Sequence, residues 1–295
     1  MQLRVDDHIV EYVRGVSDIA ERYDAFLVDV WGVLHDSARA YPGAPECLQQ
    51  LQRRGKRVIL LSNAARRSSL LEEEFSACGI LPSMYECIVS SGELTWQAFA
   101  AGGDPELERL GKRYYLFGSA RYRLTEGLPL FRATKVAAAD FLLAVGVAGS
   151  PQTTAEYEEV LQEAAGRDLP MVCANPDIWV VRNGKIGIAP GALAARFKEL
   201  GGKVIYFGKP YQAVYRRCFD ILQGIDPRRI VAAGDALVTD IAGAEDQKID
   251  SLLVAGGIHN SQLEDIPEDS AGLAGICREY NRFPAMLVKT FIWKN

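Results

Sequence analysis

The feature that most constrains this chain is a short apolar run that contains an acidic residue and is followed by a glycine. Residues 26–34 read FLVDVWGVL, so Asp29 interrupts the run and Gly32 follows three positions later. A strand that buries both faces in a parallel sheet has such a continuous apolar sequence. Ligands of open α/β sheets bind at the carboxyl ends of strands, where we expect Asp29 to lie. An acidic residue after a strand is also a common turn or cap residue, so Asp29 alone establishes no site.

Apolar runs alternate with segments of helical periodicity along the first part of the chain. We expect strands over 25–30, 57–63 and 86–91, separated by helices over 44–54 and 67–78. This alternation predicts a parallel sheet with right-handed crossovers. Residues 8–22 have apolar side chains at near-helical spacing and are predicted to form an amphipathic leading helix.

A second α/β pattern occupies the middle of the chain. It predicts strands over 113–117, 140–147 and 170–174, a polar helix over 152–166, and a tight hairpin turn at residues 182–185 (RNGK). The first pattern then resumes with strands over 204–209, 229–235 and 251–257, helices over 211–224 and 239–248, and a helical tail over 261–295. We therefore predict a doubly wound parallel-sheet core formed by 1–104 and 203–295, with an α/β domain inserted at 105–202.

Composition limits the classes of partner and the cellular compartment that we expect for this protein. The 295 residues carry a net charge of −5, which offers no basic face for nucleic acid and no polybasic membrane anchor. The N-terminus has no signal-peptide apolar core, and the longest small-apolar run, 136–149, is interrupted by Asp140 and too short to span a bilayer. The six cysteines form no CxxC pair, as is typical of thiols in a reducing compartment. We expect a cytoplasmic protein without nucleic-acid or membrane partners.

Polar side chains stand at four predicted strand ends. If these strands belong to one parallel sheet, the side chains converge on one crevice. Three carboxylates, a lysine and a hydroxyl need a counter-charge, and a divalent cation with a phosphate group supplies one. The oxygen ligands suit Mg²⁺. The residues are Asp29, Ser62, Asn63, Lys209, Asp235 and Asp240.

These stretches resemble, in order, the four motifs of the haloacid dehalogenase (HAD) superfamily: DVWGV from Asp29, LSN ending at Asn63, GKP around Lys209 and GDALVTD from 234 to Asp240. The segments ANPD at 174–177 and APG at 189–191 further resemble the NagD-like, class IIA branch, whose α/β cap is inserted after the third core strand. That branch contains phosphatases of nucleotides, sugar phosphates and pyridoxal phosphate. The resemblance implies a HAD, Rossmann-like core with a class IIA cap, and a Mg²⁺-dependent phosphatase of a small phosphorylated metabolite.

The resemblance also implies a role for each matching residue. Asp29 would attack phosphorus and form an aspartyl-phosphate, and Asp29, the carbonyl of Trp31 and Asp235 would bind Mg²⁺, supported by Asp240. Ser62, Asn63 and Lys209 would hold phosphoryl oxygens, and Asn175 and Asp177 would lie on the cap loop that selects substrate. Relatives also form dimers through the cap, so a homodimer is a further expectation. The substrate itself is not specified by these motifs, because fold does not determine function.

The chain departs from the family pattern at Trp31. Family phosphatases have a second aspartate there, which protonates the leaving group and then activates water. An indole does neither, and the loss of a general acid–base typically lowers the rate on the order of 10²–10⁴-fold. His35 or Asp36 could supply the acid instead, or the leaving group could need no proton.

Three hypotheses follow for the function. The first is a phosphatase that works without an acid at position 31. The second is a low-turnover ligand-binding or regulatory protein on the same scaffold. The third is a carbon-centred, dehalogenase-like hydrolase, but those enzymes use no metal and lack an equivalent of Asp235.

Several of these residues also have an ordinary structural interpretation. Asp240 or Thr239 could cap the following helix. Lys209 could lie in solvent at a strand end, and Trp31 could simply pack over the site. His35 and the 175–177 segment are also typical turn residues.

Overall fold

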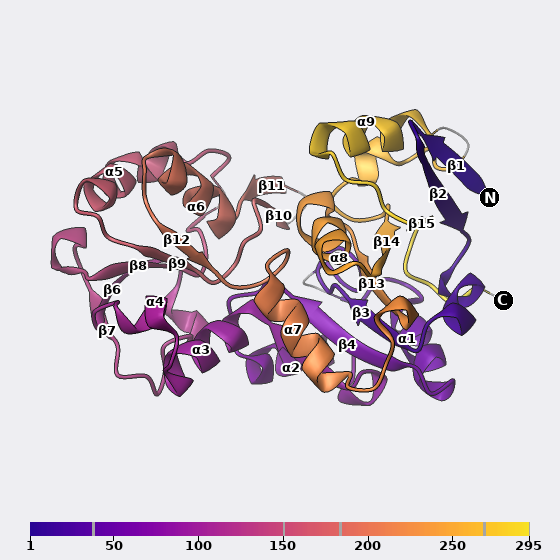
Figure 1. The fold of residues 1–295 in the computed structure, drawn as a ribbon, viewed down its shortest axis with the longest axis horizontal. Helices are drawn as coiled ribbons and strands as arrows, with labels where there is room; N and C mark the ends of the chain where they lie inside the picture. The colour runs from indigo at the N-terminus through magenta and orange to yellow at the C-terminus, as the bar shows by residue number, and fades with distance from the viewer. Residues whose placement is uncertain (37–38, 150, 183–184, 268–269, 295) are drawn as a thin grey trace. The chain divides into compact units, whose positions relative to one another are not determined.

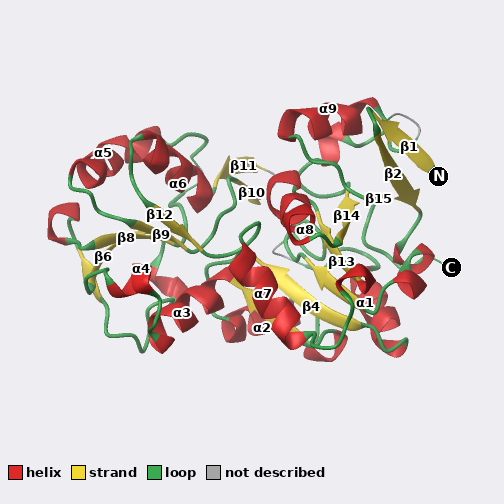
Figure 2. Cartoon of the chain, in the orientation of Figure 1, coloured by secondary structure: helices red, strands yellow, loops and turns green. Residues whose placement is uncertain are grey.

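The computed structural model describes residues 1–36, 39–149, 151–182, 185–267 and 270–294. Contacts within the chain separate it into two compact units. Unit 1 comprises Met1–Ser62, Ser69–Val89 and Tyr215–Asn295, and unit 2 comprises Asn63–Ser68 and Ser90–Val214. Each unit is a sheet with helices against it (Figures 1 and 2). Within the described residues, no helix has both the length and the apolar character needed to cross a membrane.

Unit 1 is built on an eight-stranded sheet with the order β1-β2-β15-β14-β13-β3-β4-β5. Strands β1 and β2 pair antiparallel, and the pairings from β2 through β15, β14, β13 and β3 to β4 are parallel. The strands are β1 (Gln2–Val5), β2 (His8–Val13), β3 (Ala25–Val28), β4 (Arg57–Ser62), β5 (Cys87–Ser90), β13 (Ile230–Gly234), β14 (Asp250–Val254) and β15 (Met286–Val288).

Strand β3 lies between two parallel neighbours, β4 and β13, and all four of its residues are buried. The continuous apolar run predicts this position, because a central strand covered on both faces has no polar side. Helix α9 covers one face with Leu273, Ile276 and Cys277, which pack among side chains of β1, β2, β14 and β15. The segments connecting this sheet include α1 (Ala44–Arg53), α2 (Ser68–Ala77), α7 (Gln212–Ile221), α8 (Ala242–Gln247) and α9 (Ala271–Tyr280).

Unit 2 is built on a five-stranded, entirely parallel sheet with the order β12-β9-β8-β6-β7. Its strands are β6 (Arg113–Phe117), β7 (Phe131–Ala133), β8 (Phe141–Ala144), β9 (Met171–Cys173) and β12 (Val204–Tyr206). Its helices are α3 (Ser91–Ala101), α4 (Pro105–Glu108), α5 (Glu158–Gly166) and α6 (Pro190–Glu199). Side chains of β8 alternate between two cores, with Leu142 packed among residues of α5 and α6, and Leu143 among residues of α3. The sheet therefore has helices on both faces, of which the sequence pattern predicted only the one that corresponds to α5, over 152–166.

A two-stranded antiparallel sheet, β10 (Trp179–Arg182) and β11 (Lys185–Ile188), completes unit 2. Its register pairs Arg182 with Lys185, as the predicted hairpin requires. The two turn residues of that prediction, 183–184, lie outside the described residues.

The predicted leading helix over 8–22 is wrong. Residues His8–Val13 form strand β2, and two short 3₁₀ turns follow, Val16–Asp18 and Ala20–Arg22. The cause is tertiary, since β2 pairs with both β1 and β15 and its β-branched residues suit a strand once such neighbours exist. Within the described residues of the tail, helix is confined to α9 and a short 3₁₀ turn, Asn260–Gln262, and Met286–Val288 extends the core sheet as β15.

The assignment of residues 204–209 to the core sheet is also wrong. Strand β12 pairs with β9 in the sheet of unit 2. Helix α3 packs on that sheet as well, because Leu94, Ala98 and Phe99 contact its buried core. An apolar run shows that a segment is a buried strand, but it carries no information about which sheet receives it. The inserted domain with bounds at 105 and 202 stays a prediction.

Two helical glycines in unit 2 provide a stability test. An ideal Cβ on Gly92 in α3 would lie 2.3 Å from the backbone nitrogen of Arg66, whereas one on Gly166 in α5 would meet nothing within 4 Å. We expect Gly92→Ala to destabilise the protein by about 1–3 kcal/mol through overpacking, and Gly166→Ala to stabilise it by up to about 1 kcal/mol through helix propensity. Thermal unfolding midpoints measure both, and similar shifts in the two variants would contradict the close backbone contact.

Candidate active site

The carboxylates of Asp29, Asp235 and Asp240 form a buried cluster in unit 1. Asp29 follows β3 and Asp235 follows β13, and these strands are parallel neighbours whose register pairs Val28 with Ala233. Carboxylate oxygens of the three residues all lie within 4.8 Å of one another. The side chains are only 8%, 7% and 4% exposed, respectively. The sequence-predicted convergence of these three residues at one sheet edge is therefore present.

Backbone N–H groups hold two of these carboxylates in place. Asp235 Oδ2 accepts a hydrogen bond from the N–H of Ile258 at 2.8 Å, and Asp240 Oδ2 accepts one from the N–H of Ala236 at 3.1 Å. Asp240 lies on a π-helical turn, Leu237–Ile241, which leads directly into α8. The local backbone therefore supplies donors for negatively charged oxygens without adding another side chain.

Glycines leave room for the Asp235 carboxylate. An ideal Cβ on Gly32, whose φ is +81°, would lie 2.1 Å from Asp235 Oδ2, and one on Gly257 would lie equally close. Any side chain at either position would displace the carboxylate. Sequence reasoning noted Gly32 three positions after Asp29 and missed Gly257. The Gly256–Gly257 pair at the end of an apolar run was the available signal.

The donor set fits a hard divalent cation. Three like charges buried this close together repel one another strongly unless a counter-charge neutralises them. Carboxylate and carbonyl oxygens are the ligands that Mg²⁺ prefers. The carbonyl oxygen of Trp31, two residues after Asp29, accepts no hydrogen bond from any described residue. This carbonyl is one of the metal ligands that the family resemblance implies.

Trp31 is held by an aromatic contact rather than by polar groups. Its ring lies edge-on to His35, with centroids 5.6 Å apart, and His35 in turn contacts Phe75 at 5.4 Å. His35 is 5% exposed, so its imidazole fills the space between the two rings. Asp36 is exposed and accepts the N–H of Arg39 at 3.1 Å. Of the two alternative acids considered from the sequence, His35 lies in contact with Trp31 and helps to orient its indole.

Two further groups near the cluster were missed by sequence reasoning. Burial, followed by the negative charges of Asp36 and Asp235, raises the pKa of Tyr41, so its hydroxyl stays protonated. His259 lies in the same loop as Ile258, and its Nδ1 is 3.0 Å from Gln262 Oε1. Burial lowers the pKa of His259 and favours a neutral imidazole, so this loop adds no positive charge at neutral pH. Isolated Tyr and His residues carry no pattern that would have revealed these positions.

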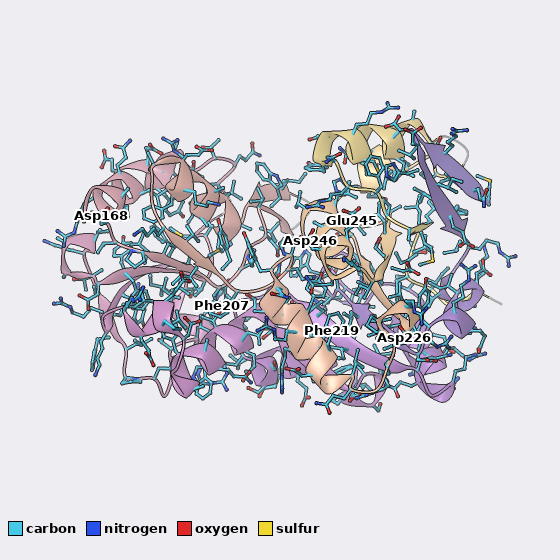
Figure 3. All side chains as sticks on the ribbon, viewed as in Figure 1. Asp168, Phe207, Phe219, Asp226, Glu245 and Asp246 are labelled. Carbon is cyan, nitrogen blue, oxygen red and sulfur yellow. The ribbon has the colours of Figure 1, made fainter. Side chains whose placement is uncertain are left out.

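The far end of α8 is fixed by the C-terminal segment. Figure 3 labels Glu245 and Asp246 on this helix, and the guanidinium of Arg282 lies 2.9 Å from the Glu245 carboxylate and 3.6 Å from that of Asp246. Glu245 also accepts the N–H of Phe283 at 2.8 Å. These contacts hold α8, and they thereby support the turn that carries Asp240.

Ser62 occupies the carboxyl end of β4, the other neighbour of β3. Leu60 pairs with Val28, so Ser62 and Asp29 leave the sheet at adjacent positions of the same edge. Ser62 is 7% exposed. The structure therefore places its hydroxyl in unit 1, at the edge that carries the carboxylates.

Asn63, Lys209, Asp177 and Asn175 form a second polar group, in unit 2. Asn63 Oδ1 accepts the N–H of Lys209 at 2.7 Å, and its Nδ2 donates to the Lys209 carbonyl at 3.1 Å and to Asp177 Oδ1 at 2.8 Å. Asn175 Oδ1 accepts the N–H of Asp177 at 3.0 Å, which closes a tight turn. Asn63 and Lys209 are 3% and 2% exposed. The amide of Asn63 thus ties the 175–177 loop to the Lys209 backbone.

The nine residues singled out in the sequence therefore fall into two groups. Unit 1 contains Asp29, Trp31, Ser62, Asp235 and Asp240, and unit 2 contains Asn63, Asn175, Asp177 and Lys209. The assumption that all their strands share one sheet is wrong for Lys209, since β12 belongs to the sheet of unit 2. The chain passes from one unit to the other at the Ser62–Asn63 peptide.

Comparison with known families and proteins gives consistent matches. Residues 26–125 match a family model described as haloacid dehalogenase-like hydrolase, and residues 206–274 match a second HAD-hydrolase-like model. The chain is 28% identical to mouse (Mus musculus) chronophin, covering 86% of this chain and 88% of that protein. It is 26% identical to the ribonucleotide monophosphatase NagD of Escherichia coli K12, covering 81% and 90%. A haloacid dehalogenase-like hydrolase structure from Brucella suis superposes with a TM-score of 0.80 at 29% identity, covering 95% of this chain and all of that one.

The glycine contact at Asp235 predicts a loss of metal binding on substitution. Gly257→Ala would place a methyl group 2.1 Å from Asp235 Oδ2, whereas a Cβ on the neighbouring Gly256 comes no closer than 3.1 Å to its nearest neighbour. We expect Gly257→Ala to weaken Mg²⁺ binding roughly tenfold or more, since misplaced ligands fit octahedral Mg²⁺ poorly. Gly256→Ala is the matched control and should bind Mg²⁺ nearly as the wild type does. Calorimetric titration measures both affinities, and equal affinities would show that the glycine is not needed for the carboxylate geometry.

Proposed function

Because the chain belongs to the haloacid dehalogenase-like hydrolases, in the NagD-like branch, we propose that it is a Mg²⁺-dependent phosphatase of a small phosphorylated metabolite. The observation that carries the proposal is the cluster of three buried carboxylates whose oxygens lie within 4.8 Å of one another. Such a cluster suits a cation and a phosphoryl group. Because the related proteins are hydrolases, we expect water to be the final acceptor of the phosphoryl group. The relative NagD is named as a ribonucleotide monophosphatase, which supports a phosphoric monoester as the substrate class.

In the proposed reaction Asp29 is the nucleophile. One of its carboxylate oxygens forms a bond to phosphorus while the bond from phosphorus to the leaving-group oxygen breaks, giving an aspartyl-phosphate and a leaving group that departs as an oxyanion and takes its proton from solvent. Water then attacks the phosphorus of the intermediate, which releases inorganic phosphate and restores the carboxylate.

The metal would be held by Asp29, the carbonyl of Trp31 and Asp235, with Asp240 supporting Asp235. When bound, Mg²⁺ neutralises charge on the transferring phosphoryl oxygens. The N–H of Ile258 donates to one oxygen of Asp235 at 2.8 Å, which supports a fixed orientation of this carboxylate.

Ser62, Asn63 and Lys209 are proposed to hold the phosphoryl oxygens. A lysine ammonium and a hydroxyl donate hydrogen bonds to the charge that develops there. Asn63 has both of its amide groups engaged by the Lys209 backbone and Asp177, so its proposed part is to position Lys209 and to offer its own N–H. Asn175 and Asp177 are proposed to contact the leaving group. Their turn, closed by a 3.0 Å hydrogen bond, provides a rigid loop for selection.

Trp31 limits the leaving groups that the enzyme can expel. An indole neither protonates the departing oxygen nor activates water, so a substrate whose leaving group departs as a stable anion is favoured. Acyl phosphates and aryl phosphates meet this condition better than simple alkyl phosphates. We propose that the physiological substrate has such a leaving group.

Two alternatives remain open to experiment. A low-turnover binding or regulatory protein would keep the metal and phosphate ligands and lack hydrolysis, and Trp31 favours it. A carbon-centred hydrolase would not need the Asp235 and Asp240 pair, and the close packing of that pair with Asp29 favours the phosphatase. A cytoplasmic location, a homodimer through the inserted domain, and the lack of nucleic-acid or membrane partners stay predictions.

The nucleophile can be tested directly with a phosphate-release screen. The panel contains sugar phosphates, nucleotides, pyridoxal phosphate, acyl phosphates and 4-nitrophenyl phosphate, each with and without Mg²⁺. We expect turnover in the wild type with Mg²⁺ and none above background in Asp29→Asn, because an amide cannot form the acyl phosphate.

Asp7→Asn, at an exposed turn between β1 and β2, removes the same charge elsewhere and should leave the rate unchanged. Full activity in Asp29→Asn would rule out the covalent mechanism. If the wild type binds Mg²⁺ but releases phosphate from none of the substrates in the panel, the result would favour the regulatory alternative.

The position of Trp31 predicts a gain of function. Trp31→Asp restores a general acid–base, and we expect 4-nitrophenyl phosphate turnover to rise by up to roughly 10²-fold, with a larger gain for alkyl phosphates, whose leaving groups need the proton more. Trp31→Phe keeps an aromatic ring beside His35 and is the control, with no gain expected. A loss of turnover in Trp31→Asp would instead assign Trp31 a positive role in shaping the site.

A further inference from the structure

Unit 2 contains a cavity that the proposed catalytic residues do not line. Its volume is about 590 Å³, which lies within the range of roughly 300–1,000 Å³ that is typical of small-molecule sites. All of its lining residues belong to unit 2: Gly118, Ser119, Ala120, Arg121, Tyr122, Arg132, Val147, Ala148 and Gly149.

The cavity lies where the strand order of the parallel sheet reverses. The chain runs from β6 to its neighbour β7 and then crosses to β8 on the other side of β6. The loops that follow β6 and β8 therefore leave the sheet in opposite directions and open a crevice between them. Residues 118–122 and 147–149, on these two loops, line the cavity. Ligands of open α/β sheets bind at such switch points, outside the carboxyl ends of the strands.

Two glycines keep the base of the crevice free of side chains. Gly118 has a φ of +110°, and an ideal Cβ on it would lie 2.6 Å from the backbone nitrogen of Gly146. A Cβ on Gly146 would lie 2.9 Å from the ring of Tyr122. The two loops therefore contact each other through their backbones, and the Tyr122 ring packs over Gly146. The absence of side chains at the two glycines lets a ligand come close to the main chain.

The cavity is positively charged. Arg121 and Arg132 line it, and its lining contains no acidic residue. Within the part of the chain that the structure describes, neither guanidinium forms an ion pair, whereas the adjacent Arg123 pairs with Glu126 at 2.6 Å. The Ser119 hydroxyl oxygen accepts the N–H of Arg121 at 3.3 Å, so the hydroxyl hydrogen stays available as a donor.

We propose that this cavity binds the anionic group of a phosphorylated small molecule through Arg121, Arg132 and the Ser119 hydroxyl. Guanidinium groups present paired N–H donors that match phosphate oxygens, and charge-assisted hydrogen bonds of this kind are among the strongest in proteins. The volume exceeds the need of a bare phosphate, so the remaining space, against Tyr122 and Val147, takes an organic portion. Binding requires none of the carboxylates of unit 1, so the proposal goes beyond the phosphatase activity.

The phosphorylated molecule that binds in the cavity is either the substrate itself or a separate effector. The sheet of unit 2 is parallel, so the loops after β6, β8, β9 and β12 share one edge, and Lys209 follows β12 there. Two to three strand spacings separate the crevice from β12, about 10–15 Å. A substrate with a second anionic group could span that distance, or a separate effector could occupy the cavity. The chemistry of binding is the same in both cases.

Binding is tested first, without turnover. Pyrophosphate is titrated calorimetrically into the full-length protein in metal-free buffer, comparing wild type with Arg121→Gln/Arg132→Gln. We expect the double variant to bind roughly 10- to 100-fold more weakly, because two charge-assisted contacts are lost. Arg109→Gln/Lys112→Gln removes the same charge from exposed positions before β6, at the opposite edge of the sheet, and should bind as the wild type does.

An unchanged affinity in Arg121→Gln/Arg132→Gln, or an equal loss in the control variant, would overturn the proposal. This outcome is independent of catalysis, since no phosphate is released in the assay. If the protein shows the expected difference in pyrophosphate affinity but no phosphatase activity, the proposal of this site stands and only the proposed function is overturned.

Kinetic measurements with Mg²⁺ then distinguish between the substrate and a separate effector as the occupant of the cavity. If the cavity holds the far end of the substrate, Arg121→Gln/Arg132→Gln raises KM for bisphosphorylated substrates and leaves kcat/KM for 4-nitrophenyl phosphate unchanged. If it holds an effector, pyrophosphate changes wild-type turnover of 4-nitrophenyl phosphate without competing with it, and the double variant does not respond. Either pattern supports the site.

Discussion

The carboxylates of Asp29, Asp235 and Asp240 repel one another, and the surrounding backbone nevertheless holds them within 4.8 Å. In a buried setting this repulsion is large. The structure overcomes it by parallel pairing of β3 with β13, which delivers Asp29 and Asp235 to adjacent points of one sheet edge, and by backbone N–H groups of Ile258 and Ala236. These strand pairings and backbone contacts fix the arrangement of the cluster in unit 1.

Rigidity at the cluster comes from close backbone approach. Gly32 and Gly257 flank the Asp235 carboxylate so tightly that no side chain fits at either position. The turn that carries Asp240 continues into α8, which Arg282 fixes by its ion pair with Glu245. A carboxylate that cannot rotate away from its like-charged neighbours is a poor structural element but a good metal ligand, because the ordering cost is met during folding rather than on binding.

The sequence predicted the parts of this site that depend on local pattern. Asp29 and Asp235 follow buried apolar runs, and alternating strands and helices predict parallel sheets, so both residues were expected at carboxyl ends of strands. That β3 and β13 share one sheet was a condition of the prediction, and their parallel pairing in the structure meets it. The pattern could not predict that β12 joins the sheet of unit 2, since Val204–Tyr206 would suit any buried position. Nor could it predict β2, where pairing with β1 and β15 overrides helical spacing. Arg121 and Arg132 are eleven positions apart without a motif, and only the strand order of unit 2 brings them to one cavity.

Trp31 connects the packing of the site to its chemistry. The family pattern that the chain resembles has a second aspartate at position 31; here the indole packs edge-on to His35, which contacts Phe75. The indole carries no charge, so it adds no further repulsion to the three carboxylates. An indole also supplies no proton to a leaving group. The proposed enzyme therefore combines strong electrostatic stabilisation of the phosphoryl group with little help for the leaving group, and its substrates should be those whose leaving groups need none.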